Sequence, residues 1–154
     1  MKIMTLKDVL LSRNEIERYY EGHVPVNLWR ALNIRRQAAL FELIESDMLL
    51  KNGRPRPADI TIVQVGGMKW VHISKQPRGI STFDKLGAPS GPDWEYFRIP
   101  AGTELPPGLA VVKDKFSTTM GATHYTIAPS HDMPLEQFKM LLTKLAAKVI
   151  KETA

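Results

Sequence analysis

Two stretches carry side chains that could act on a charged ligand. In the last β-branched run, His124 stands beside Tyr125, so a titratable imidazole and an aromatic phenol fall together there. Arg30 lies inside the apolar run 28–32, where its guanidinium must either reach solvent or meet an anion. On pattern alone the solvent face is favoured, because successive residues of a strand point to opposite faces.

Adjacent hydroxyls form a third candidate. Ser81 and Thr82 follow shortly after Gly79, and on pattern alone such a pair is typical of a turn or of a helix cap. His72 alternates with apolar neighbours in a short run. A lone histidine of this kind is more often a packed or surface residue than a ligand.

Several familiar site motifs are missing from the sequence. There is no cysteine and no HExxH spacing, so no metal site is expected from the four histidines, which are His23, His72, His124 and His131. A Walker loop, a GxGxxG turn and a GxSxG elbow are also absent. The pair Gly66-Gly67 precedes a strand and is therefore no dinucleotide-binding turn. Spacing identifies no carboxylate pair for glycoside chemistry.

Composition predicts one domain over residues 1–154. The formal net charge of +5 could attract nucleic acid, anionic membranes, acidic proteins or phosphorylated ligands. The densest basic patches, 35–36 and 51–56, lack interleaved aromatics, so a solvated surface is favoured over a nucleic-acid face. No apolar run is long enough to span a bilayer, and Asp8 interrupts the start of the chain, so we expect neither membrane insertion nor a signal peptide. Residence in the cytoplasm follows, with export by a machine that needs no cleavable signal left open.

Periodicity predicts helices at the front, short strands in the middle and a closing helix. We expect one helix over 5–20, or two short ones broken near 12–14, then a strand over 24–34 and an amphipathic helix over 37–50. Strands over 58–65 and 68–74 flank Gly66-Gly67 as a hairpin, and further strands follow at 94–99 and within 97–129. A helix over 134–150 ends the chain. This order predicts an α+β fold with a mainly antiparallel sheet core.

Three ordered segments carry a resemblance to a known family. They are GISTFD at 79–84, IPAGTELPPGL at 99–109 and ATHYTIAP at 122–129, with Met133 after them; LWRA at 28–31 adds to the pattern. In this order and spacing they resemble the ADP-ribosyltransferase-like cytotoxic effectors of type VI secretion, the Tse toxin family. The resemblance covers residues 57–133, about half of the chain.

The resemblance implies an ADP-ribosyltransferase-like split antiparallel β-sandwich with flanking helices, with NAD in the cleft between two small sheets. It implies a bacterial cytotoxic effector that acts inside cells as an NAD-dependent ADP-ribosyltransferase on an unknown intracellular target. It also implies a cognate immunity protein that occludes the cleft. Such an effector resides in the cytoplasm of its producer and is delivered into the cytoplasm of a target cell by a secretion machine.

The resemblance also assigns roles to residues. Arg30 would hold a phosphate or ribose of NAD, because a guanidinium binds phosphate bidentately. Ser81 would position the nicotinamide ribose, and Thr82 and Phe83 belong to the same NAD-binding segment. The strand residues next to the sugar or the nicotinamide ring would be His124 and Tyr125, and Ser81 and His124 are the catalytic candidates.

Two departures from the family pattern leave alternatives open. Ile80 stands where the family commonly has a hydroxyl, and Thr82 should face away from Ser81 on a strand. No glutamate is assigned as the carboxylate that polarises the ribose, and Glu95 and Glu104 are candidates by location only. The chain could therefore transfer ADP-ribose, hydrolyse NAD, or bind nucleic acid or protein without catalysis. An immunity protein is disfavoured, because such partners are often acidic.

Overall fold

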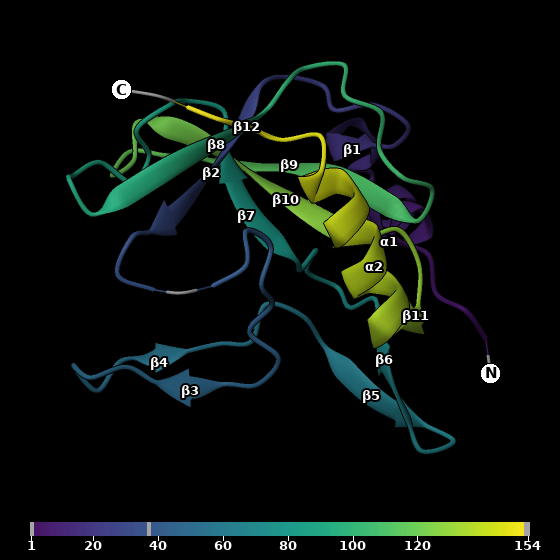
Figure 1. Cartoon of the computed structure of the whole chain (residues 1–154). Helices are drawn as coiled ribbons and strands as arrows, with labels where there is room; N and C mark the ends of the chain where they lie inside the picture. The colour runs from purple at the N-terminus through teal and green to yellow at the C-terminus, as the bar shows by residue number, and fades with distance from the viewer. Residues whose placement is uncertain (1, 37, 153–154) are drawn as a thin grey trace.

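A computed structural model describes residues 2–36 and 38–152 of the chain. Most of the regular structure is antiparallel strand, accompanied by the helices α1 (Leu6–Ser12) and α2 (Leu135–Ala146) and by a 3-10 turn, η1 (Ile16–Arg18) (Figure 1). The strands are β1 (Tyr19–Tyr20), β2 (Leu28–Asn33), β3 (Met48–Leu49), β4 (Pro55–Arg56), β5 (Ile62–Val65), β6 (Met68–Val71), β7 (Ile80–Phe83), β8 (Trp94–Ile99), β9 (Leu109–Ser117), β10 (Ala122–Pro129), β11 (Met133–Pro134) and β12 (Ile150–Lys151). The predicted α+β class is confirmed.

The largest sheet has the strand order β1-β9-β10-β7-β2-β8-β12, and its neighbours pair antiparallel. A smaller sheet has the order β11-β6-β5, and β3 pairs with β4 alone. Gly66 and Gly67 join β5 to β6 with φ angles of 57° and 78°, the left-handed pair that a two-residue hairpin needs. The predicted hairpin is therefore confirmed, with strands shorter than expected.

Helices cover both faces of the β9–β10 hairpin. On one face, α2 buries Phe138, Leu142 and Leu145 against Val111 and Ile127 in one apolar cluster. On the other face, α1 buries Leu6 and Leu10 against Ala110, Val112 and Ala128. Adjacent strand residues thus serve opposite cores, as the pleat requires. The predicted closing helix is confirmed, with its apolar stripe buried.

The front of the chain forms two short turns of helix. Thr5 caps α1, since its Oγ1 accepts the Asp8 N–H at 3.2 Å. The helix ends at Ser12, and Asn14 follows with a left-handed φ of 57°. Of the two predicted arrangements for residues 5–20, the break near 12–14 is confirmed, but the second piece is only the 3-10 turn η1, and Tyr19–Tyr20 form β1 instead of helix. No helix in the described part of the chain has the length and apolar character needed to cross a membrane.

The predicted amphipathic helix over 37–50 is wrong. Gln37 lies outside the described residues; residues 38–47 form a turn, a bend and irregular backbone, and Met48 enters β3. Side chains from outside the segment fix this backbone: the Asp59 carboxylate accepts the Ile44 N–H at 2.7 Å. Phe41 and Leu43, two residues apart, are buried in the core, which is the spacing of extended chain and not of a helix.

Candidate active site

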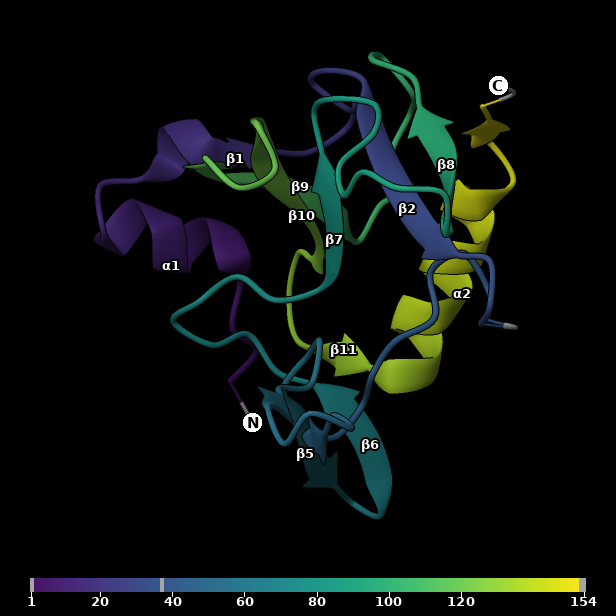
Figure 2. The same ribbon diagram turned by 90° about the vertical axis from the view of Figure 1, so that its left-hand side faces the viewer.

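The large sheet divides between β2 and β7. β7 pairs along its length with β10, and β2 pairs along its length with β8. Between β2 and β7 the one residue pair in the described chain is Trp29 with Phe83. Beyond that pair the two strands separate, as Figure 2 shows. A split of this kind leaves the backbone of β7 accessible to side chains from β2.

Arg30 lies at this division. Its Nη1 donates to the Ser81 carbonyl at 3.1 Å, and its Nε donates to the Leu40 carbonyl at 3.2 Å. Burial lowers the pKa of Arg30, with Arg56 and Arg36 adding to the effect, while Asp59 opposes it. A guanidinium nevertheless stays charged in proteins. Since the two carbonyls use only part of its donor set, Arg30 can also bind an anion.

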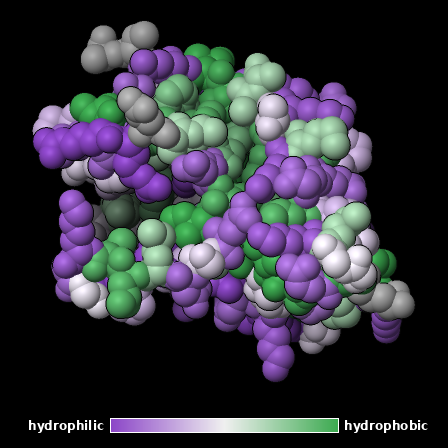
Figure 3. Space-filling view, turned by 60° about the horizontal axis from the view of Figure 1, so that its bottom comes forward, coloured by the Kyte–Doolittle hydropathy of each residue, from purple (hydrophilic) through white to green (hydrophobic). Residues whose placement is uncertain are grey.

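A cavity of about 450 Å³ opens beside Arg30. Its lining includes Ser81, Phe83 and Trp94, together with two further arginines, Arg36 and Arg56. Figure 3 shows the surface hollowed beside the β3–β4 hairpin. The volume falls within the range of about 300–1,000 Å³ that is typical of small-molecule sites. Its cationic lining suits a phosphorylated ligand.

Strand alternation separates the hydroxyls of β7. Ser81 is exposed toward the cavity, whereas Ile80 and Thr82 are buried. The Thr82 hydroxyl donates to the Tyr125 carbonyl at 3.0 Å. Tyr125 lies opposite Thr82 in the register and is itself buried, which raises the pKa of its phenol. The structure therefore brings Arg30, Ser81 and Phe83 together, and places Thr82 and Tyr125 in the interior instead.

His124 stands at the edge of this site. It lies opposite Phe83 in the register, and the two rings meet edge to face with centroids 5.2 Å apart. Opposed residues of an antiparallel pair share a face of the sheet. His124 is thus on the same face as Ser81, although its side chain does not line the cavity.

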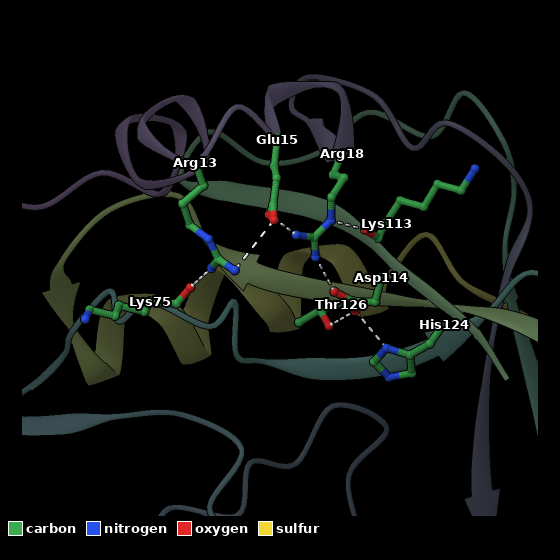
Figure 4. Close-up of polar contacts among 8 residues, drawn as sticks. All are labelled: Arg13, Glu15, Arg18, Lys75, Lys113, Asp114, His124 and Thr126. Atoms are coloured by element: carbon green, nitrogen blue, oxygen red, sulfur yellow. Dashed lines mark hydrogen bonds and ion pairs between the residues drawn. The ribbon is translucent and has the colours of Figure 1, made fainter.

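A polar cluster surrounds His124 (Figure 4). Its Nδ1 is 2.7 Å from Oδ2 of Asp114, and the Thr126 hydroxyl donates to the same oxygen at 2.6 Å. The other carboxylate oxygen, Oδ1, pairs with Arg18 at 3.1 Å. Arg18 also pairs with Glu15 at 2.7 Å. The cluster ties the N-terminal segment to the β9–β10 hairpin.

Sequence reasoning missed the carboxylates that the fold brings to this region. Glu42 and Asp59 line the cavity, and the wrongly predicted helix over 37–50 concealed the position of Glu42. Of the two glutamates named from the sequence, Glu95 pairs with Lys151 at 3.3 Å and Glu104 lines a separate pocket beside Gly22 and Pro106. Neither reaches the cavity at Arg30.

Comparison with known proteins identifies the family. The model of the family described as Tse2 ADP-ribosyltransferase toxin matches residues 5–154. The chain belongs to this family. Toxin Tse2 of Pseudomonas aeruginosa is 44% identical over 55 residues, which are 36% of this chain and 34% of that toxin. The matched part thus spans about a third of that relative's length. The resemblance of this chain to the Tse toxin family, predicted from three sequence segments, is confirmed. The cavity at Arg30 is the candidate active site of this Tse2-family chain.

Proposed function

We propose that this chain is a bacterial toxin that takes NAD as its substrate and transfers ADP-ribose to a target inside the cell. The observation that supports it is the meeting of Arg30 and Ser81 at one cavity, where β2 and β7 separate. The family, whose name specifies an ADP-ribosyltransferase toxin, supports the same reaction.

The residues of the cavity fit the chemistry of NAD. The substrate carries a pyrophosphate, and Arg30, Arg36 and Arg56 line the cavity, with Arg56 also paired to Asp59 at 3.2 Å. Ser81 offers a hydroxyl that can bond a ribose hydroxyl, and Phe83 gives the site an aromatic wall. NAD supplies the ADP-ribosyl group and the nicotinamide leaving group. In this proposal the chain's own residues bind and orient the substrate and stabilise developing charge.

The proposed biological setting follows from the family. The toxin resides in its producer, is neutralised there by a cognate immunity protein that covers the cleft, and is delivered into the cytoplasm of a target cell. An immunity protein of acidic surface would complement the net charge of +5.

Expression in a bacterial host tests the proposed function. The wild-type chain should arrest growth, and Arg30→Ala and Ser81→Ala should each relieve the arrest. Losing a charged hydrogen-bonding group costs about 1.5–3 kcal/mol, or about 10- to 150-fold in substrate binding. The matched control is Arg35→Ala, because Arg35 is exposed, pairs with Asp93 at 3.3 Å and does not line the cavity.

The outcomes separate the alternatives. Growth arrest that persists in Arg30→Ala, with the variant folded and expressed, would contradict a role for the cavity. Normal growth of cells that accumulate folded wild-type protein would contradict the toxin itself. Mass spectrometry of cell extracts detects a modified target. Release of nicotinamide with no modified target would show that the chain hydrolyses NAD and does not transfer ADP-ribose.

A further inference from the structure

We propose that Asp114 is a positioning residue for His124, and that the pair supplies the base that takes the proton of the ADP-ribose acceptor. The inference rests on the proposed function and deepens it. It assigns the proton-accepting role to a histidine backed by a carboxylate, where no glutamate of the chain had been assigned.

The contact between the two side chains is specific. His124 Nδ1 lies 2.7 Å from Asp114 Oδ2. A carboxylate accepts hydrogen bonds and does not donate them, so Nδ1 carries the proton. In the neutral ring, the lone pair is then on Nε2. This is the tautomer that a general base at Nε2 requires.

A β-bulge brings Asp114 to the histidine. The register of β9 with β10 passes from Phe116 opposite Thr123 to Lys113 opposite Tyr125. Two residues of β9, Asp114 and the lysine after it, therefore oppose His124 alone. Bulges of this kind redirect a side chain, and they are frequent beside active sites. Continued from Thr123 opposite Phe116, the register would place Lys115 opposite His124; continued from Tyr125 opposite Lys113, it places Asp114 there.

The partners of Asp114 hold its carboxylate in place. Thr126 donates to Oδ2 at 2.6 Å, and Arg18 pairs with Oδ1 at 3.1 Å. Arg18 is held in turn by Glu15 at 2.7 Å and by the Lys113 carbonyl at 2.7 Å. A carboxylate fixed on both oxygens restrains the imidazole that it contacts, as carboxylates do behind functional histidines elsewhere.

The strand order places His124 between its carboxylate and the site. In the sheet, β10 lies between β9 and β7. The imidazole has Asp114 of β9 at Nδ1 and the Phe83 ring of β7 edge to face against it, with centroids 5.2 Å apart. Phe83 and Ser81 line the cavity. His124 thus borders the proposed NAD site through Phe83, and the proposal assigns Nε2 as the atom that serves it.

The proposed step breaks one bond of NAD and forms one bond to the acceptor. The bond between ribose C1′ and the nicotinamide nitrogen breaks, and its electron pair leaves with nicotinamide. A new bond forms from the acceptor atom to C1′. The proton of the acceptor passes to Nε2 of His124 and then to solvent.

Substitution of Asp114 gives the test. In purified protein, Asp114→Asn should lower kcat by about 10- to 100-fold with little change in KM for NAD, because NAD is bound elsewhere.

Thr126→Val is the matched control. It removes another hydrogen bond to the same carboxylate oxygen while leaving the Nδ1 contact intact. Its kcat should fall less than that of Asp114→Asn. Equal kcat in wild type and Asp114→Asn would overturn the inference. So would identical losses in both variants, because the cluster would then be only structural.

A spectroscopic measurement keeps the inference testable if Asp114→Asn fails to fold. Nitrogen NMR of the wild type should show His124 protonated at Nδ1, and the opposite tautomer would overturn the inference. Failure of the proposed function is a separate result, because wild-type protein would then release no nicotinamide at any pH.

Discussion

At the scale of single residues, Arg30 keeps a charge where burial opposes it. Burial lowers its pKa, and the nearby Asp59 counteracts that effect. The two backbone carbonyls that it bonds come from Ser81 and Leu40, on opposite sides of the division. The guanidinium therefore both bridges the divided backbone and presents charge to the cavity. A lysine could not do both, because its ammonium lacks the planar fork.

Tyr19 gives a residue-scale prediction about pH. Burial raises the pKa of Tyr19, and the hydrogen bond to Glu21 at 3.0 Å raises it further. Above about pH 10, the unfolded chain loses this proton while the folded chain keeps it. The free energy of unfolding should therefore fall as the pH rises past about 10. Urea unfolding across alkaline pH measures the slope.

The control for this prediction is Tyr19→Phe, which removes the titrating phenol. Its unfolding free energy should fall less steeply with pH, with the remaining slope coming from groups such as Tyr125. Equal slopes in the variant and the wild type would contradict the account.

At the scale of elements, β7 depends on the glycine that precedes it. A Cβ added at Gly79 would lie 1.9 Å from the Ile127 carbonyl oxygen and 2.9 Å from its carbon. Backbone cannot move aside as a side chain can, so the β7–β10 pairing must shift. Gly79→Ala should lower the free energy of unfolding by about 3 kcal/mol or more, as measured by urea unfolding.

Gly67→Ala is a useful comparison for that variant. Its Cβ would meet nothing within 4 Å, but the φ of 78° is strained for alanine. It should cost only about 1–2 kcal/mol. A smaller loss for Gly79→Ala than for Gly67→Ala would contradict the close approach of Gly79 to β10.

Helix α2 gives a second element-scale prediction. Phe138 is fully buried in the main core, whereas Met140 on the same helix is 54% exposed. Phe138→Ala should lower the free energy of unfolding by about 3–5 kcal/mol. Met140→Ala should stay within about 0.5 kcal/mol. Thermal or urea unfolding measures both, and comparable losses would show that α2 is not docked through Phe138.

Local patterns predicted some of these elements and not others. The strand at 94–99, the Gly66-Gly67 hairpin and the closing helix depend on neighbouring residues, and the sequence was sufficient for them. The segment after Gln37 takes its hydrogen bonds from Asp59, fifteen residues beyond Ile44. The helical spacing of apolar residues over 37–50 therefore predicted a helix that the structure does not contain.

The site was predictable to a similar extent. Strand alternation correctly turned Thr82 away from Ser81. Arg30 is half-buried and lines the open cavity, and its bonds to the Leu40 and Ser81 carbonyls depend on a separation of β2 from β7 that no local pattern encodes. The contact of Asp114 with His124 depends on a bulge, which shifts the hairpin register by one residue. Spacing alone could not have indicated it.

At the scale of the whole molecule, the cavity forms where the two halves of the large sheet, β2 with β8 and β7 with β10, separate. Residues distant in sequence meet there: Arg30 from β2, Ser81 and Phe83 from β7, Glu42 from the segment wrongly predicted to be helical, and Asp59 from the loop that follows β4. The apolar clusters under α1 and α2 hold the central strands from both faces. The rigid hairpin β9–β10 thus supports β7 while leaving its other edge free to divide from β2.

The most direct test of the account is nicotinamide release from NAD by the purified chain. Wild-type protein and Arg35→Ala should release nicotinamide at similar rates, and Arg30→Ala should do so at least about tenfold more slowly at subsaturating NAD. Release by folded Arg30→Ala at the wild-type rate, or no release by folded wild type supplied with cell extract, would contradict an NAD site at the division of the sheet.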